Sequence, residues 1–525
     1  MRTFRRLLAV TSVLALGATL LAAPAAAGYQ AAPKTRSVSR SVVHSGPAGL
    51  AQQRPTSFDV ASQRSRPSAR LPRVAASPDT AAPDTFFGFD ALADLDGFFP
   101  SDTVGAVGDT VIVTAVNSSF GVFSPVDGSV LVPRTALDSI IGDPGLLHFD
   151  PKVVYDPYAD TFLVVWLGFD DAPQRSFIFT LAIPDATAVD TGSWCATSFF
   201  GDQVVGDGAQ WADYPGLGYN ESRVTITTNQ FTFADAFRYS QVMTLDKDGL
   251  YDCNQPVPVP VVFAGSKTQD QNGFQAFTMQ PAQTVGNGTG GQLLVSFQLI
   301  NGKFDYHTIW RIKPTASGFV LKKGTVSTGK VSLPPPGTQG GGGVQNDDFF
   351  WDAGDERLIN VFYDGDFDEL YTAHAVFKNF QPDTITGGYP EAAVRWYEID
   401  PATKLSNSVI VRKGLIGAPE VDLGWPTVAT DGNGNLFVTY TRASAPLGEF
   451  LSAWVAEIPV GSTSATQQLM QSGFATYDAT TGIERWGDYT GINRDPVFPD
   501  FVATFNQYAL SGVSWQQVVN AVTHV

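Results

Sequence analysis

The stretch SDTVGAVGDTVIVTAVN, residues 101–117, has a polar start, a short apolar strand, a turn and a second apolar strand. The same phrase returns as FDPKVVYDPYADTFLVVW from Phe149, ADYPGLGYNESRVTITTN from Ala212, GWPTVATDGNGNLFVTYT from Gly424 and GDYTGINRDPVFPDFVATFNQ from Gly487. Looser copies begin near Gln275 and Asn346. A spacing of mostly about 50 to 80 residues is long for a solenoid and suits one four-stranded unit with its loops.

The apolar runs inside the copies are typical of strands. VIVTAV, FLVVW, VTITT, LFVTY and FVATF are dominated by Val, Ile, Thr, Tyr and Phe. Helical spacing is visible only in TALDSIIGD and WQQVVNAV, and 51 Gly with 34 Pro supply turns. We therefore expect an all-β chain folded as a β-propeller, in which neighbouring blades share their cores.

The number of copies predicts seven blades, with six or eight as alternatives because two copies are loose. The last copy offers three strands, YTGIN, FVATFN and WQQVVNAV. We expect a strand from the start of the domain, within DTFFGFDALA at 84–93, to complete this blade and close the ring. Closure removes the exposed edges of an open array.

The first residues are typical of an export signal. Arg2, Arg5 and Arg6 form a basic start, residues 7–23 are apolar or small, and three alanines at 25–27 offer a cleavage site. We expect residues 1–27 to be a signal peptide and the mature protein to be extracellular. A membrane anchor is the alternative, although the apolar stretch is short and interrupted, and no later segment is apolar enough to span a bilayer.

Charge is divided unevenly along the chain. Residues 28–84 are rich in Ala, Pro, Ser and Arg and predict a disordered basic arm before a propeller domain at 85–525. Residues 1–84 carry 11 Lys and Arg against 3 Asp, which leaves 22 against 48 acidic residues for the domain. An acidic domain argues against nucleic acid as a partner. The arm is either a spacer or a device that holds the protein on an anionic envelope.

The chain has two cysteines, Cys195 and Cys253, each about 40 residues after the start of its own repeat. Export into an oxidising compartment favours their pairing. Because they occupy similar places in successive repeats, we expect a structural disulfide between neighbouring blades.

Polar residues at the strand ends are the best candidates for a site. In a propeller the first strand of a blade lines the axis and the second returns beside it, so residues that precede the first and follow the second share a face. The preceding residues are Asp102, Asp150, Asp213, Asp347, Asp348, Trp425 and Asp488; the following ones are Asn117, Asn229, Gln230, Asp364, Arg442, Asn506 and Gln507. They predict an acidic funnel on the axis. Asp and Asn at strand ends are equally typical of turns and caps, and that interpretation stays open.

Carboxylates without a nucleophile triad point to glycoside hydrolysis, in which two acids share the work. We take Asp150, Asp213 and Asp488 as catalytic candidates, because neighbouring ionised acids raise one another's proton affinity. Candidate substrate-binding residues are Asp102, Asn229, Trp425, Arg442, Arg485, Trp486 and Asn506. Trp486 either stacks on a sugar or wedges between blades.

We expect no cofactor and no dedicated metal site. Calcium is the one ion considered, because DGNGN at 431–435 and DGDFDE at 364–369 carry oxygen ligands at close spacing. Neither has the later bidentate Glu of the EF-hand loop, and a turn is the favoured interpretation. The five histidines show no metal-ligand pairing.

The phrases DTVGAVGD, DPKVVYDPYADTFLVVW, DYPGLGYNESRVTITTNQF and RWGDYTG resemble a group of secreted bacterial β-propellers described as sialidase-like. The resemblance covers most of residues 100–510 and is most specific at RWGDY and DYP. It implies the fold. It implies no site residue, because sialidases use an arginine triad, a Tyr nucleophile and Asp-box turns, whereas the residues before the strands here are acidic.

Two functions follow from these patterns. The first is a secreted, monomeric propeller that binds or hydrolyses an extracellular polysaccharide or cell-envelope glycan at the acidic funnel. The alternative is a non-enzymatic adhesion or scaffold propeller that acts through its rim and its basic arm.

Overall fold

The computed structural model describes residues 40–42, 82–95, 97–141, 145–204, 210–288, 290–298, 305–341, 350–380, 390–480 and 482–524. The predicted signal peptide and most of the predicted arm lie outside the described residues. Two strands include arm residues: β1 (Arg40–Val42) pairs with β10, and β2 (Asp84–Ala93) begins at the last residue assigned to the arm. Within the described part of the chain, no helix has the length and apolarity to cross a bilayer.

The chain is mostly β and folds into antiparallel meanders of four strands, as the repeated phrase predicts. The first three meanders are β3 (Val104–Val107), β4 (Ile112–Val116), β5 (Ser119–Phe123) and β6 (Val130–Ala136); β7 (Leu147–Asp156), β8 (Thr161–Asp171), β9 (Gln174–Pro184) and β10 (Cys195–Phe200); and β11 (Trp211–Tyr219), β12 (Arg223–Phe231), β13 (Phe237–Asp246) and β14 (Val261–Phe263). The helices α2 (Asp138–Ile141) and α3 (Lys247–Tyr251) follow β6 and β13.

The next three meanders are β15 (Gln280–Val285), β16 (Gln292–Gln298), β17 (Tyr306–Thr315) and β18 (Gly318–Ser327); β19 (Val361–Asp364), β20 (Glu369–Lys378), β21 (Glu391–Asp400) and β22 (Val409–Ile416); and β23 (Asp422–Thr430), β24 (Leu436–Ser444), β25 (Glu449–Ile458) and β26 (Thr466–Gln471). All five apolar runs that predict strands lie in or overlap strands, namely β4, β8, β12, β24 and β28.

The last sheet joins the two ends of the domain. β27 (Gly491–Arg494), β28 (Phe501–Ser511) and β29 (Ser514–Thr523) form an antiparallel meander, and β2 pairs with β29 as its fourth strand. Asp84 lies opposite Thr523 and Phe89 opposite Val519. The expectation that DTFFGFDALA completes the last sheet is confirmed, and WQQVVNAV is a strand rather than a helix.

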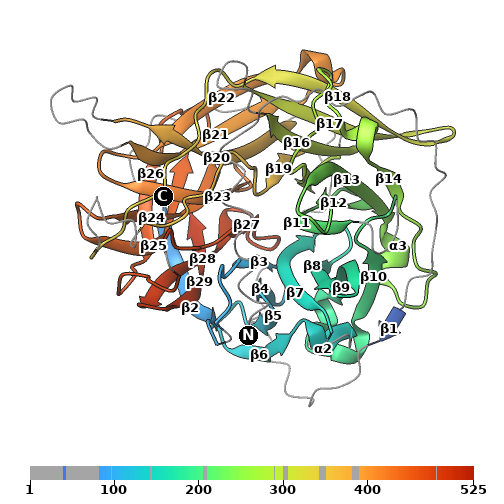
Figure 1. Ribbon diagram of the computed structural model, residues 1–525, viewed down its shortest axis with the longest axis horizontal. Coiled ribbons are helices and arrows are strands. Elements are labelled where there is room, and N and C mark those ends of the chain that lie inside the picture. The colour runs from blue at the N-terminus through green and yellow to red at the C-terminus, as the bar shows by residue number, and fades with distance from the viewer. Residues whose placement is uncertain are drawn as a thin grey trace.

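The meanders surround a common centre (Figure 1). Their first strands contact one another in the order β3, β7, β11, β15, β19, β23 and β27, and β27 contacts β3 again. The core fills the space between neighbouring meanders and includes the fully buried Trp166, Trp310 and Trp396. Strands that are covered on both faces have continuous apolar sequences, which explains the run FLVVW in β8.

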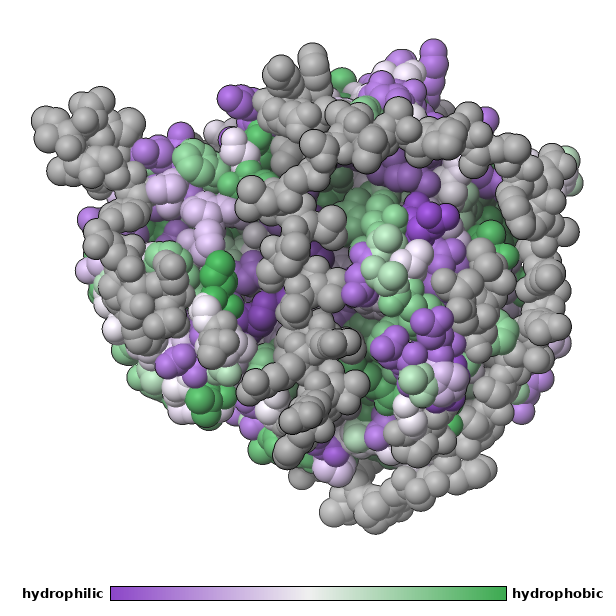
Figure 2. Space-filling model, in the orientation of Figure 1, coloured by the Kyte–Doolittle hydropathy of each residue, from purple (hydrophilic) through white to green (hydrophobic). Residues whose placement is uncertain are grey.

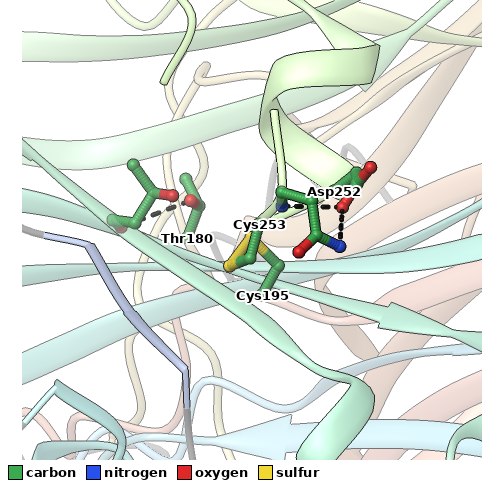
Figure 3. Close-up of a disulfide and its surroundings, with 6 residues drawn as sticks. Thr180, Cys195, Asp252 and Cys253 are labelled. Atoms are coloured by element: carbon green, nitrogen blue, oxygen red, sulfur yellow. Dashed lines mark hydrogen bonds between the residues drawn. A yellow bond between two sulfur atoms is a disulfide. The ribbon is translucent and has the colours of Figure 1, made fainter. Parts of the chain in front are cut away.

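Cys195 and Cys253 form a disulfide, and this prediction is confirmed (Figure 3). Cys195 is the first residue of β10 in the second meander. Cys253 follows α3, the short helix that comes after the third strand of the next meander. Their Cα atoms are 5.3 Å apart and 58 positions separate them in the chain. The bridge therefore ties two neighbouring meanders together, as their equivalent places in the repeats predict.

Candidate functional site

A left-handed residue recurs at the start of the inner strands. The φ angles of Asp102, Asp150, Tyr214, Thr278 and Trp425 all lie between 51° and 56°. In β7, β11 and β23 the pairing with the next strand shifts register at this point. A left-handed L-residue costs roughly 1–2 kcal/mol, and such positions persist only where the surrounding structure fixes them. The same bulge is thus built into several meanders at one end of the ring.

Four carboxyl groups meet at this end, one from each of four meanders: Asp102, Asp150, Asp213 and Asp488, the acidic cluster. Asp102 is fully buried, and its Oδ1 accepts a 3.0 Å hydrogen bond from the backbone N of Asp488. Its Oδ2 accepts a 2.6 Å bond from Asn117 Nδ2. Both oxygens of Asp102 are therefore used inside the protein, which suits a residue that positions its neighbours.

Two tyrosines hold Asp150. Its Oδ2 accepts hydrogen bonds from the phenol of Tyr489 at 2.9 Å and from the backbone N of Tyr214 at 3.2 Å. The Tyr214 phenol donates to the backbone O of Asp488 at 3.2 Å, and the two tyrosine rings lie 4.8 Å apart. Asp150 and Asp488, which are distant in sequence, are thus fixed in one packed unit.

Three cations accompany the acidic cluster. Arg485 donates to both carboxylate oxygens of Asp488 at 2.9 Å. The guanidinium of Arg357 lies 4.4 Å from the ring centre of Tyr214 and binds Asp355. The ammonium of Lys152 lies 3.3 Å from the ring centre of Tyr489. These cations offset part of the charge that burial would otherwise make prohibitive.

Burial and mutual repulsion raise the pKa values of the cluster. Burial, reinforced by the charge of Asp150, raises the pKa of the half-buried Asp213 to about 8, although Arg357 opposes this shift. Burial and Asp488 raise the pKa of Asp150 to about 6, against the Tyr489 hydrogen bond and Lys152. Burial lowers the pKa of Lys152 to about 7. Near neutral pH the cluster therefore holds a protonated Asp213 beside an ionised Asp150.

The segment before β19 also reaches the cluster, and sequence reasoning missed it. Asp352 Oδ2 lies 3.9 Å from Arg485 Nε, and its backbone O accepts a 2.7 Å bond from the indole of Trp425. The side chains of Asp352 and Asp355 are about a third exposed. Aligning LINVFYD at 358–364 with the other inner strands would have placed DAGDER at the strand start. The predicted pair at this position, Asp347 and Asp348, lies outside the described residues.

The remaining candidates for substrate binding are not brought to the cluster's carboxylates. Asn229 bonds Thr278 and Ser240, and Asn506 bonds Thr439 and the backbone O of Tyr440. Arg442 pairs with Glu449 and stacks on Trp454 at 4.1 Å. Trp486 is buried, donates to Thr441 Oγ1 and packs edge-on against Tyr477. Trp425 and Arg485 do lie beside the cluster, because Trp425 donates to the backbone O of Asp352 and Arg485 donates to the carboxylate of Asp488.

The predicted residues at the ends of the second strands mostly form hydrogen bonds that link neighbouring meanders. Asn117 Oδ1 accepts from the backbone N of Asp150, and Asn229 Oδ1 accepts from the backbone N of Thr278, both at 2.8 Å. In each case the asparagine satisfies the left-handed residue of the following meander. We predicted that these asparagines line one side of the funnel. In the structure their side chains instead hold neighbouring meanders together.

An axial cavity lies inside the ring of first strands. Every inner strand or the residues just before it contributes to the wall, which is made of Val104, Gly105, Lys152, Val153, Val154, Leu217, Gln280, Gln283, Ile359, Asn360, Thr427, Thr490, Gly491 and Ile492. Lys152 belongs to both the cavity and the surroundings of the acidic cluster. The face drawn in Figure 2 shows strongly hydrophilic residues on both sides of its centre.

Among the described residues, no set of three or more His, Cys, Asp or Glu side chains has an arrangement that could hold a metal ion. The Asp431 carboxylate, in the loop considered for calcium, accepts from the backbone N of Asn433 and Asn435 and from Asn435 Nδ2. Its oxygens thus close a turn.

No protein-family model matches the chain, and no curated protein matches it. Among solved structures it is similar to an α-L-arabinofuranosidase of Fusarium graminearum, with 11% identity and a TM-score of 0.37 over 84% of this chain and 98% of that chain. A protein of unknown function from Dyadobacter fermentans has 8% identity and a TM-score of 0.41 over 85% and 100%. A sialidase of Trypanosoma rangeli has 9% identity and a TM-score of 0.36 over 82% and 58%. Likeness at this level carries no argument about chemistry.

Proposed function

We propose that the protein is a secreted seven-bladed β-propeller that binds and hydrolyses an extracellular glycan at the acidic cluster. The observation that carries the proposal is that Asp213 and Asp150, from adjacent meanders, lie close enough for the charge of Asp150 to raise the pKa of Asp213. One carboxyl is half-buried and protonated near neutral pH, and the other is ionised. Two carboxyl groups whose surroundings push their pKa values apart are what acid-assisted glycoside hydrolysis requires.

The roles follow from the surroundings of each carboxyl group. Asp213, with a pKa of about 8, donates its proton to the leaving glycosidic oxygen. Asp150, whose pKa of about 6 leaves it ionised at pH 7, either attacks the anomeric carbon as the nucleophile or takes a proton from the water that attacks it. Asp488 stays with Arg485, and Asp102 positions Asp488 through its backbone N.

The blade assignment rests on the cyclic contact of the first strands and on the completion of the last sheet by β2. Each four-stranded meander is taken as one blade. Secretion is part of the proposal and is supported by the signal peptide that the sequence predicts at residues 1–27.

Release of reducing sugar from a panel of polysaccharides, together with a glycan array, tests this function on the purified mature protein. We expect Asp213→Asn to lower the rate of hydrolysis by about 100-fold or more, because general acid catalysis contributes roughly 10²–10⁴. Binding on the array and the melting temperature should change little, since an amide fills the same half-buried space.

Asp127→Asn is the matched control, because Asp127 is an exposed carboxylate in the turn between β5 and β6. It should keep full activity. Undiminished hydrolysis by the Asp213 variant would reject the role of Asp213. Failure of the unchanged protein to bind or cleave any glycan would reject the function as a whole.

A further inference from the structure

Cations gather at the outer edge of the fourth and fifth meanders, in a domain that is otherwise acidic. Residues 305–330 and 395–413 contain nine of the domain's 22 Lys and Arg but only three of its 48 acidic residues. Five of these cations form the basic patch: Lys322, Lys330, Arg395, Lys404 and Lys413. The four lysines of the patch are exposed and Arg395 is half-buried. Charge is therefore segregated on the folded domain as well as along the chain.

Lys322 and Lys404 flank one contact between the two meanders. Lys322 in β18 is opposite Arg311 in β17, so their side chains share a face of the sheet. On that face Arg311 donates to the backbone O of Pro401 at 2.9 Å and to that of Thr403 at 3.3 Å. Lys404 is the next residue in the same loop, which follows β21. The fold thus brings the two lysines to the same junction although they belong to different meanders.

The other three cations meet at a second contact along the same edge. The ammonium of Lys413, in β22, donates to the backbone O of Thr328, just after β18, at 2.8 Å. Arg395 Nη1, in β21, donates to the backbone O of Lys330 at 3.5 Å. β18 also contacts β22, and both strands lie on the outside of the ring (Figure 1). The basic patch therefore crosses the boundary between the fourth and fifth meanders.

The acidic residues of the same segments do not neutralise the patch. Glu398 forms its ion pair with Arg412. Asp305 is buried, and Asp400 accepts from the backbone N of Ala402 at 2.9 Å. Among the described residues, no ion pair involves any of the five cations of the patch. Their charge is open to a partner in solution.

Lysines on edge strands also have a structural use, because they hinder edge-to-edge pairing with another chain. β18 and β22 are the last strands of their meanders, so this use accounts for Lys322 and Lys413. It does not account for Lys330, Arg395 and Lys404, which lie after β18, in β21 and in a loop. The grouping of all five cations therefore points to an anionic ligand.

We propose that the basic patch binds a linear polymer whose backbone carries repeated phosphate groups and no bases. Thr328 follows Lys322 by six residues of extended chain, roughly 20 Å, so one small anion cannot span both contacts whereas a polymer can. Four of the five cations are lysines, which bind phosphate as point charges, while planar carboxylates favour the fork of arginine. At physiological salt, charges more than about 8 Å away are largely screened, so the acidic remainder of the domain does not prevent local binding. The patch acts independently of the acidic cluster and of the glycan chemistry.

Lysine acetylation followed by mass spectrometry of the unchanged protein tests the patch residue by residue. We expect linear inorganic polyphosphate to slow the acetylation of Lys322, Lys330, Lys404 and Lys413. Lys267, an exposed lysine just after β14 of the third meander, should be acetylated at the same rate with and without polyphosphate. Unchanged rates at the four patch lysines would overturn the proposal.

Matched double variants measure the strength of binding through the fluorescence anisotropy of labelled polyphosphate. Lys322→Gln with Lys404→Gln should weaken binding about 10-fold or more, because each lysine near an anionic surface contributes about a factor of five. Arg238→Gln with Lys267→Gln removes the same charge from exposed residues of the third meander and should leave binding unchanged. Every variant keeps residues 28–84, so the contribution of these basic residues is the same throughout. Equal weakening by both double variants would contradict a localised site.

Other anions define the class of partner. Polygalacturonate, single-stranded DNA and phosphatidylglycerol vesicles should each bind more weakly than polyphosphate at equal concentration of charge. Tripolyphosphate should also bind more weakly, because it is too short to span the patch. Tighter binding of a carboxylate polymer, of DNA or of vesicles, or equally tight binding of tripolyphosphate, would overturn the assignment to a phosphate polymer.

Discussion

Tyr489 and Asp150 lie 339 positions apart in the chain, yet the phenol of Tyr489 donates a 2.9 Å hydrogen bond to Asp150 Oδ2. Tyr489 precedes β27 in the last meander, and Asp150 lies in β7 of the second. The contact exists because β27 of the last meander lies close to β7 of the second meander as well as to β3 of the first. It also holds the pKa of Asp150 below the value that burial alone would give.

Tyr489→Phe should therefore destabilise the fold in a pH-dependent way. The variant loses a hydrogen bond to a charged carboxylate, worth roughly 1.5–3 kcal/mol. At pH 5 Asp150 is protonated in the folded state of both proteins, so the loss is small there. Without the Tyr489 hydrogen bond, the pKa of Asp150 in the folded variant is higher still. The variant therefore loses additional stability as the pH rises above about 6. Urea unfolding at pH 5 and pH 8 measures this difference.

Tyr214→Phe is the control for this prediction. The phenol of Tyr214 donates to the backbone O of Asp488, an uncharged acceptor, at 3.2 Å. Its removal should cost roughly 1 kcal/mol with little dependence on pH. An equal loss for Tyr489→Phe at both pH values would show that its phenol does not act through the charge of Asp150.

The strands, the order of the meanders and the disulfide were predictable because each rests on a local pattern that repeats. Asp102, Asp150, Asp213 and Asp488 were found for the same reason, as each stands just before or near the beginning of an inner strand. Their partners were not, since the pairing of Asp150 with Tyr489 depends on how distant meanders meet. Lys152 was overlooked although it stands two residues after Asp150, because a single lysine in a strand has no pattern that marks it as buried.

The acid side of the stability curve should be governed in part by His374. It lies in β20, is fully buried, stacks on Tyr397 of β21 and has its pKa lowered by burial to about 3. The unfolded chain takes up a proton near pH 6.5, whereas the folded protein does not until about pH 3. Stability contributed by the neutral imidazole is thus lost as the pH falls from about 6.5 towards 3, by about 1.4 kcal/mol per unit.

His374→Phe should flatten this slope, as seen by comparing urea unfolding at pH 4.5 and pH 7.5. Tyr397→Phe removes the same 3.1 Å contact between His374 Nε2 and the phenol without removing the titrating group. It should keep the slope of the unchanged protein. If both variants behave alike, the titration of His374 is not the cause.

The disulfide should contribute substantially to stability. It closes a separation of 58 residues, for which chain entropy gives about 4 kcal/mol. We expect the double variant Cys195→Ala with Cys253→Ala to lose this amount in guanidinium unfolding, and the reduced unchanged protein to behave similarly. A loss below about 1 kcal/mol would contradict the expectation that the bridge stabilises the fold by restricting the unfolded chain.

The last prediction concerns Glu420, which has a left-handed backbone with φ of 67° and an exposed side chain just before β23. Its backbone N donates to Glu391 Oε1 at 3.1 Å, and glycine keeps this bond. Relief of the left-handed strain, roughly 1–2 kcal/mol, exceeds the extra entropy that glycine gives the unfolded chain. Glu420→Gly should therefore stabilise the protein by about 0.5 to 1 kcal/mol. Lys404→Gly, at an exposed residue with φ of −98°, should destabilise it by a similar amount. Denaturant unfolding of both variants gives the answer, and a loss of stability in both would show that Glu420 is not strained.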